Sequence, residues 1–176
     1  MLDGQSAEHG GSGLVPMREG CKKVCHHAFN MSPFCALFTP MSAKPFAFPI
    51  KVLPADIDFM GHVNNARYLN WVQDTVLAHW HKLAPADEVA SKAWVALKHE
   101  ITYRKPAFLD DEVIAETVLE QIKGARSFYN TVIRRGEDIL AEVKSMWCCL
   151  DSKTHRPARI SAETAEKYFG ISGRTA

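Results

Sequence analysis

One long helical pattern, followed almost entirely by strand patterns, constrains the fold of this chain more than any other feature. Between residues 66 and 83 apolar side chains recur at steps of three and four, which places them on one face of a helix of about five turns. These positions are Ala66, Leu69, Val72, Val76, Trp80 and Leu83. Because a helix with one apolar face must bury it against another element, a sheet is expected to cover it.

Four segments after the helix alternate apolar and polar residues at the period of two that is typical of strands. They are residues 93–106, 111–122, 126–136 and 138–151. Gly124 and Gly136 predict hairpin turns between the last three of them.

The ends of the organised region have patterns of their own. An extended segment at residues 46–57 contains Pro49 and Pro54, which restrict it to an edge or irregular strand. A short terminal helix is expected between an N-cap at Ser161 and a stop at Gly170.

The predicted order is therefore strand, long helix and four antiparallel strands. This order gives an α+β domain in which the helix packs on one face of a five-stranded antiparallel sheet. One helix covers only part of such a sheet, and its edge strands stay unpaired. We therefore expect a homodimer or homotetramer that continues the sheet.

Composition limits the class of protein. A chain of 176 residues with 47% hydrophobic residues suits one domain. Its net charge of +1 predicts no nucleic-acid partner. No apolar run approaches the roughly 18 residues of a membrane span. The five cysteines are odd in number and indicate reduced thiols, so we expect a cytoplasmic protein.

Residues 1–44 differ from the rest of the chain. They are rich in Gly and polar residues and show no period, which predicts a flexible extension before a domain at residues 45–176. Cys21, Cys25, His26 and His27 are possible soft metal ligands. Their spacing matches no zinc signature, so no metal site is predicted.

The stretch ADIDFMGHVNNARYLNW, residues 55–71, gathers polar residues where the helix begins. Asp56 and Asp58 point to the same side if the first strand is still regular there. Asn64 is a good N-cap, and the amide of Asn65 then has no acceptor within the helix. A carboxylate close to such an amide is what thioester hydrolysis requires, without any metal. Capping and turn chemistry alone is the alternative.

The string DIDFMGHVNNARYLNW resembles the signature of the hotdog-fold acyl-CoA thioesterases of the 4-hydroxybenzoyl-CoA thioesterase type. In that family an Asp, a short gap, Gly-His-Val-Asn-Asn and Tyr-Leu open the central helix. The string also resembles plant acyl-carrier-protein thioesterases, which share HVNN followed by a tyrosine. The resemblance covers residues 45–150. It implies a single hotdog domain, with one long central helix wrapped by a five-stranded antiparallel sheet, that hydrolyses acyl-CoA without a cofactor.

The resemblance also implies roles for single residues. The catalytic aspartate falls on Asp58, three residues before the Gly61 of the motif, and acts as nucleophile or general base. The backbone amide near Asn65 polarises the thioester carbonyl. His62 matches a histidine that is catalytic in the plant enzymes. Those enzymes have an asparagine where this chain has Met60, which favours the version built on an aspartate and a helix terminus.

The residues expected to bind the substrate are Gly61, Tyr68, Trp71, Arg104 and Lys105. Gly61 lets the backbone turn, and Tyr68 and Trp71 are expected to line a tunnel for the acyl group. The segment TYRKPAFLDDEV resembles the Tyr-x-x-Pro segment of the family. Its Arg104 and Lys105 are candidates for the phosphates of coenzyme A, with simple solvation of a surface as the equal alternative.

Other interpretations stay open at this point. Asp74 on the helix is a secondary catalytic candidate, although a solvated helix surface explains it as well. A non-catalytic hotdog subunit that binds acyl thioesters or serves in assembly is the competing function, and Asp58 argues against it. A hotdog dehydratase is a second competitor, but we find no hydratase motif. The sequence leaves open the acyl chain length and the choice between acyl-CoA and acyl-carrier protein.

Overall fold

The predicted long helix is α1, Asn65–Leu83. It begins where the pattern predicts, because the Oδ1 of Asn64 accepts the Ala66 amide at 2.9 Å. One face of α1 is buried at the expected helical spacing. Its members are Tyr68, Trp71, Val72, Thr75, Val76, His79 and Trp80.

The computed structural model describes residues 45–170, which belong to one compact unit. The extension predicted for residues 1–44 and the last six residues lie outside this described part. The strands are β1 (Phe46–Lys51), β2 (Lys92–Tyr103), β3 (Glu112–Lys123), β4 (Arg126–Arg135) and β5 (Asp138–Asp151).

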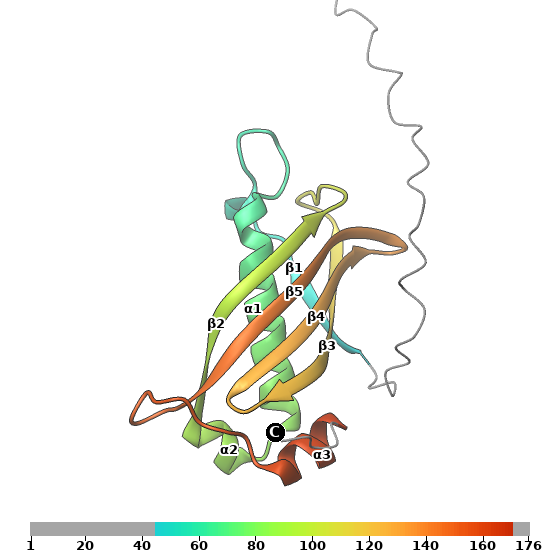
Figure 1. Cartoon of the computed structure of the whole chain (residues 1–176). Coiled ribbons are helices and arrows are strands. Elements are labelled where there is room, and N and C mark those ends of the chain that lie inside the picture. Colours follow the sequence, from blue (N-terminus) through green and yellow to red (C-terminus); the bar gives the residue numbers. More distant parts are fainter. Residues whose placement is uncertain (1–44, 171–176) are drawn as a thin grey trace, which may run out of the picture. The chain divides into compact units, whose positions relative to one another are not determined.

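All neighbouring strands are antiparallel, in the order β1-β3-β4-β5-β2, and α1 lies against one face of this sheet (Figure 1). The α+β prediction of one long helix on a five-stranded antiparallel sheet is therefore confirmed. None of the helices of residues 45–170 is long and apolar enough to cross a membrane.

Three short elements complete the fold. The terminal helix α3, Ala162–Phe169, is capped by Ser161 and ends at Gly170, whose φ of 64° suits glycine. The 3₁₀ turn η1 (Pro54–Asp56) and the helix α2 (Ala86–Ser91) were not predicted. Neither has enough residues to establish a period, so apolar spacing carries no signal for them.

The two edges of the sheet differ in length and chemistry. β1 has six residues and contains Pro49, as an edge strand allows. β2 has twelve residues, pairs with β5 on one side, and leaves Val95 and Leu97 45% and 49% exposed. A long edge with exposed apolar side chains is a surface on which another strand can pair.

His79 is a buried titratable side chain on α1. Its ring stacks on Phe46 at 5.1 Å and meets the edges of Tyr129 and Phe169 at 5.9 and 5.3 Å. Within residues 45–170 no partner reaches its Nδ1. Burial, and then repulsion from Lys82, lowers the pKa of His79 to about 4.

This shift predicts how stability depends on pH. His79 becomes protonated near pH 6.5 in the unfolded chain and near pH 4 in the folded chain. The stability that neutral His79 contributes is therefore complete above pH 6.5 and is lost as the pH falls toward 4. Over that range, the free energy of unfolding of wild type should fall relative to that of His79→Leu by about 1.4 kcal/mol per pH unit. Urea titrations at several pH values measure it. A difference between wild type and His79→Leu that stays constant with pH would contradict the prediction.

Candidate active site

Asp58 lies in a short closed loop between η1 and α1. Its amide donates to the His62 carbonyl at 2.9 Å, and its carbonyl accepts from the Gly61 amide at 3.0 Å. One carboxylate oxygen accepts the Met60 amide at 2.9 Å, and the other lies 3.6 Å from the His62 Nδ1. Gly61 permits this closure because its φ is 80°. The loop therefore holds the Asp58 carboxylate beside the His62 ring, with 14% of the Asp58 side chain exposed.

The condition under which Asp56 and Asp58 would point to the same side, a first strand that is still regular at these residues, is not met. β1 has ended and Pro54 begins the turn η1, so strand alternation no longer applies. Asp56 instead turns inward and is 1% exposed. Its Oδ1 lies 2.6 Å from the Nε of Arg67, and its Oδ2 accepts the Leu53 amide at 3.0 Å. Asp56 therefore fixes the entry to α1.

The first turn of α1 offers an unpaired backbone amide. The Asn64 carbonyl accepts the Arg67 amide at 2.9 Å, and the Asn64 side chain accepts the Ala66 amide. The Asn65 amide has no acceptor among residues 45–170. The Asn65 carbonyl accepts the hydroxyl of Tyr103 at 2.8 Å, which ties the end of β2 to this turn. A free amide at the positive end of a helix can stabilise a developing oxyanion.

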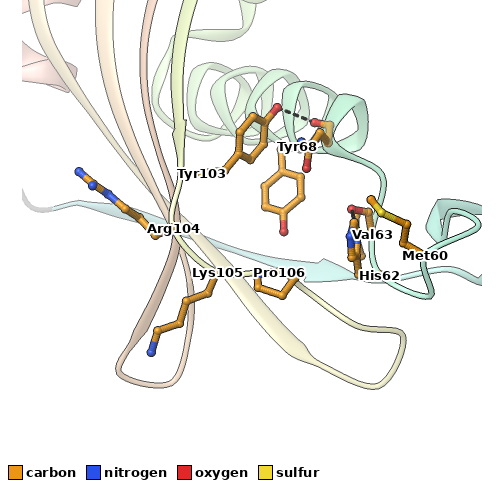
Figure 2. Close-up of a pocket in the computed structure, with 9 residues that line it drawn as sticks. Met60, His62, Val63, Tyr68, Tyr103, Arg104, Lys105 and Pro106 are labelled. Carbon is orange, nitrogen blue, oxygen red and sulfur yellow. Dashed lines mark hydrogen bonds between the residues drawn. The ribbon is translucent and has the colours of Figure 1, made fainter. Parts of the chain in front are cut away.

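A pocket of about 250 Å³ lies beside this end of the helix. Figure 2 shows Tyr68 and Tyr103 between the loop that carries Met60 and His62 and the segment that carries Arg104. The complete lining is Met60, His62, Val63, Asn65, Tyr68, Tyr103, Arg104, Lys105 and Pro106. The loop and the start of α1, which are adjacent in the sequence, thus form one pocket with the distant end of β2.

The two tyrosines of this pocket are neutral hydrogen-bonding groups. The Tyr68 hydroxyl accepts the Ala107 amide at 3.0 Å. Burial raises the pKa of Tyr68 and also that of Tyr103 above the ordinary value of 10.0. Both hydroxyls therefore keep their protons at neutral pH.

The structure brings five of the eight expected site residues into this pocket: His62, Asn65, Tyr68, Arg104 and Lys105. Asp58 and Gly61 belong to the adjoining loop, where Asp58 meets the pocket through His62. Trp71 is buried in the core with its ring centre 4.8 Å from that of Tyr68, and it does not line the pocket. The catalytic and binding roles of all eight residues stay predictions.

Metal-ligating residues do not cluster in this part of the chain. Within residues 45–170 no three His, Cys, Asp or Glu side chains are arranged to hold a metal ion. The possible ligands Cys21, Cys25, His26 and His27 lie outside the described residues.

Two contacts that build the site were missed by sequence reasoning. Arg67 stands in the first turn of α1, where a cation is unfavourable beside the positive end of the helix. That conflict is a signal that Arg67 has a carboxylate partner, here Asp56. The hydrogen bond from Tyr103 to Asn65 joins residues 38 positions apart, so no local sequence pattern predicts it.

Comparison with known proteins identifies the family of this chain. The family model described as the thioesterase-like superfamily matches residues 52–168, which include the site loop, α1 and four of the five strands. The chain belongs to the thioesterase-like superfamily. The family predicted from the DIDFMGHVNN string, and with it the hotdog fold, is thereby confirmed.

Named thioesterases are similar over most of their length. The chain is 30% identical over 125 residues to the long-chain acyl-CoA thioesterase FadM of Escherichia coli, covering 67% of this chain and 92% of that protein. It is 26% identical over 130 residues to the acyl-CoA thioesterase YbgC of Haemophilus influenzae, covering 72% and 96%. A crystal structure of a probable thioesterase from Bartonella henselae has a TM-score of 0.58 and 27% identity, covering 67% and 98%.

The ion pair between the buried Asp56 and the partly exposed Arg67 gives a prediction for this thioesterase-like domain. Asp56→Ala leaves the Leu53 amide without its acceptor and the Arg67 guanidinium without its ion-pair partner, so it should lower the free energy of unfolding by about 1–3 kcal/mol. Asp56→Asn keeps an acceptor oxygen but no charge, so its free energy of unfolding should lie between those of wild type and Asp56→Ala. Asp87→Ala, at an exposed position of α2, should stay within about 0.5 kcal/mol. Urea unfolding followed by circular dichroism measures all three, and an unchanged midpoint for Asp56→Ala would refute the account.

Proposed function

We propose that this protein hydrolyses an acyl-CoA thioester to a free carboxylic acid and coenzyme A. The observation that carries the proposal is the placement of the Asp58 carboxylate in the loop that leads directly into the free amide end of α1. The names of the similar proteins FadM and YbgC support acyl-CoA as the substrate. The name of FadM also supports a role in fatty acid metabolism.

In the proposed reaction the thioester carbonyl oxygen accepts the Asn65 amide, and Asp58 supplies the base or the nucleophile. As a base, Asp58 takes one proton from the water that attacks the carbonyl carbon. The carbon–sulfur bond then breaks, the thiolate of coenzyme A leaves with the bonding electrons, and the proton passes to the thiolate. As a nucleophile, Asp58 forms a mixed anhydride that water hydrolyses, with the same products.

His62 has a supporting part in this scheme. Its Nδ1 lies 3.2 Å from the Val63 carbonyl and 3.6 Å from the Asp58 carboxylate, which suits a proton on Nδ1. The ring thereby orients Asp58 toward the pocket that His62 lines. Asp74, the secondary candidate, is exposed on α1 and outside this lining. A part for Asp74 would need a site shared with a second copy of the chain.

The proposed assembly is a homodimer in which β2 pairs with the β2 of a second copy. The twelve-residue edge and its exposed Val95 and Leu97 support this pairing. A homotetramer made of two such dimers is the larger form of the same proposal. A cytoplasmic location accords with Cys148 and Cys149, which are both free thiols.

The proposed chemistry is tested by release of free thiol from aryl, short and long acyl-CoA thioesters. Asp58→Asn should lower kcat by about 10²–10⁴-fold, because the carboxylate charge is lost while the size is kept. Asp87→Asn on α2 should retain wild-type rates, and circular dichroism should show all variants folded. Full activity in Asp58→Asn would refute the mechanism. Binding of acyl-CoA without hydrolysis by wild type would favour the non-catalytic alternative.

The proposed dimer is tested by Leu97→Asp near the middle of β2. Antiparallel pairing of two copies brings like charges together there, so the mass in solution should fall toward the 19.7 kDa of one chain. Ile139→Asp puts the same charge at an exposed position of β5, an inner strand, and should leave the mass unchanged. Light scattering on a sizing column measures the mass. A monomeric wild type would rule out the dimer.

A further inference from the structure

The two bases of the pocket already have carboxylate partners on β5. The Nε and Nη2 of Arg104 lie 2.8 and 2.7 Å from one oxygen of Glu142. The Nζ of Lys105 lies 2.5 Å from the Oδ1 of Asp138. Neither base therefore presents a free positive charge to a ligand in the unliganded protein.

The backbone explains why these partners meet. The amides of Arg104 and Lys105 both donate to the carbonyl of Leu140, at 2.8 and 3.2 Å. Leu140 lies midway between Asp138 and Glu142 in the sequence of β5. The same anchor that positions the two bases at the pocket therefore places a carboxylate beside each of them.

The two ion pairs differ in how easily they can open. Glu142 contacts Arg104, and both side chains are about half exposed, at 42% and 56%. Asp138 is also held by Arg135 at 3.2 Å, and Arg135 is held by Asp111 at 2.6 Å. Hydrogen bonds from Lys105 and then from Arg135 lower the pKa of Asp138, so this carboxylate is charged at neutral pH. Glu142 is thus the partner that a ligand displaces with the least disturbance.

We propose that Glu142 competes with the phosphate groups of coenzyme A for Arg104. Glu142 pairs with Arg104 in the free protein and is displaced when a phosphate binds. This inference rests on the proposed function. An exposed ion pair contributes little to stability, whereas a phosphate carries more charge and fits the planar guanidinium in a bidentate manner. The exchange therefore favours the ligand, but by less than if Arg104 were free.

The competition acts equally on substrate and product because both carry the same phosphates. Binding that is weakened uniformly raises the KM for acyl-CoA and the dissociation constant of free coenzyme A by the same factor. Glu142 would therefore limit retention of the coenzyme A product in a site whose reacting groups it does not touch.

The test uses Glu142→Gln in the full-length protein, with free coenzyme A as the probe in calorimetry. Glutamine keeps the size and an acceptor oxygen but removes the charge. The dissociation constant of coenzyme A and the KM for acyl-CoA should both fall by about two- to fivefold, the range expected of one exposed ion pair. The fall in KM should not occur with an acyl-pantetheine thioester, which has no phosphates. Neither fall should occur in a protein that also carries Arg104→Gln.

Glu116→Gln is the matched control. Glu116 pairs with Arg134 at 3.0 Å, and neither residue lines the pocket. This variant changes the net charge by the same amount, so it corrects for long-range attraction of the phosphates. Its dissociation constant for coenzyme A should equal that of wild type.

Three results would overturn the inference: equal dissociation constants for the two glutamine variants, a gain that persists without Arg104, or no binding of coenzyme A to any of the proteins. Failure of the proposed function is a separate result. It would appear as absence of thiol release by wild type from every acyl-CoA tested, while free coenzyme A still binds more tightly to Glu142→Gln.

Discussion

The candidate site depends on the contacts of the buried residue Asp56. Its two carboxylate oxygens bind the Leu53 amide before the turn η1 and the Arg67 guanidinium in the first turn of α1. Its backbone carbonyl also accepts the Asn64 amide at 2.8 Å. These bonds join both ends of the loop, so the intervening residues have few ways to close, and the closure they adopt holds Asp58 beside His62.

The pocket beside this loop is lined by neutral tyrosines and by basic side chains that are paired with carboxylates. Tyr68 and Tyr103 keep their protons and act as hydrogen-bonding groups, because burial raises the pKa of each. Arg104 and Lys105 are balanced by carboxylates on β5. The Asp58 carboxylate, in the loop that leads into the free end of α1, has no Lys or Arg partner among residues 45–170, as the proposed chemistry requires.

Much of the fold follows from patterns that are local in the sequence. The spacing of apolar residues predicts α1, the alternation predicts β2 to β5, and Pro49 predicts that β1 lies at an edge. The family follows from one string of residues at the helix start. The helix and the strands are readable because the period of each is set by the contacts of a single segment with the core.

The rest of the site depends on contacts between distant segments. The inward turn of Asp56 follows from the 3₁₀ turn at Pro54, which strand alternation does not anticipate. The pairing of Arg104 with Glu142 depends on how β2 and β5 align. Trp71 shares the buried face of α1 with Tyr68, and periodicity alone does not say which of them reaches the pocket.

In the proposed mechanism the free end of α1 polarises a thioester carbonyl placed beside Asp58. The most direct measurement is the infrared carbonyl frequency of an acyl-CoA labelled with carbon-13 at the carbonyl and bound to the Asp58→Asn protein. If the Asn65 amide donates to that oxygen, the band lies at a lower frequency than for the same thioester in water. A band at the frequency seen in water, or above it, would contradict the account.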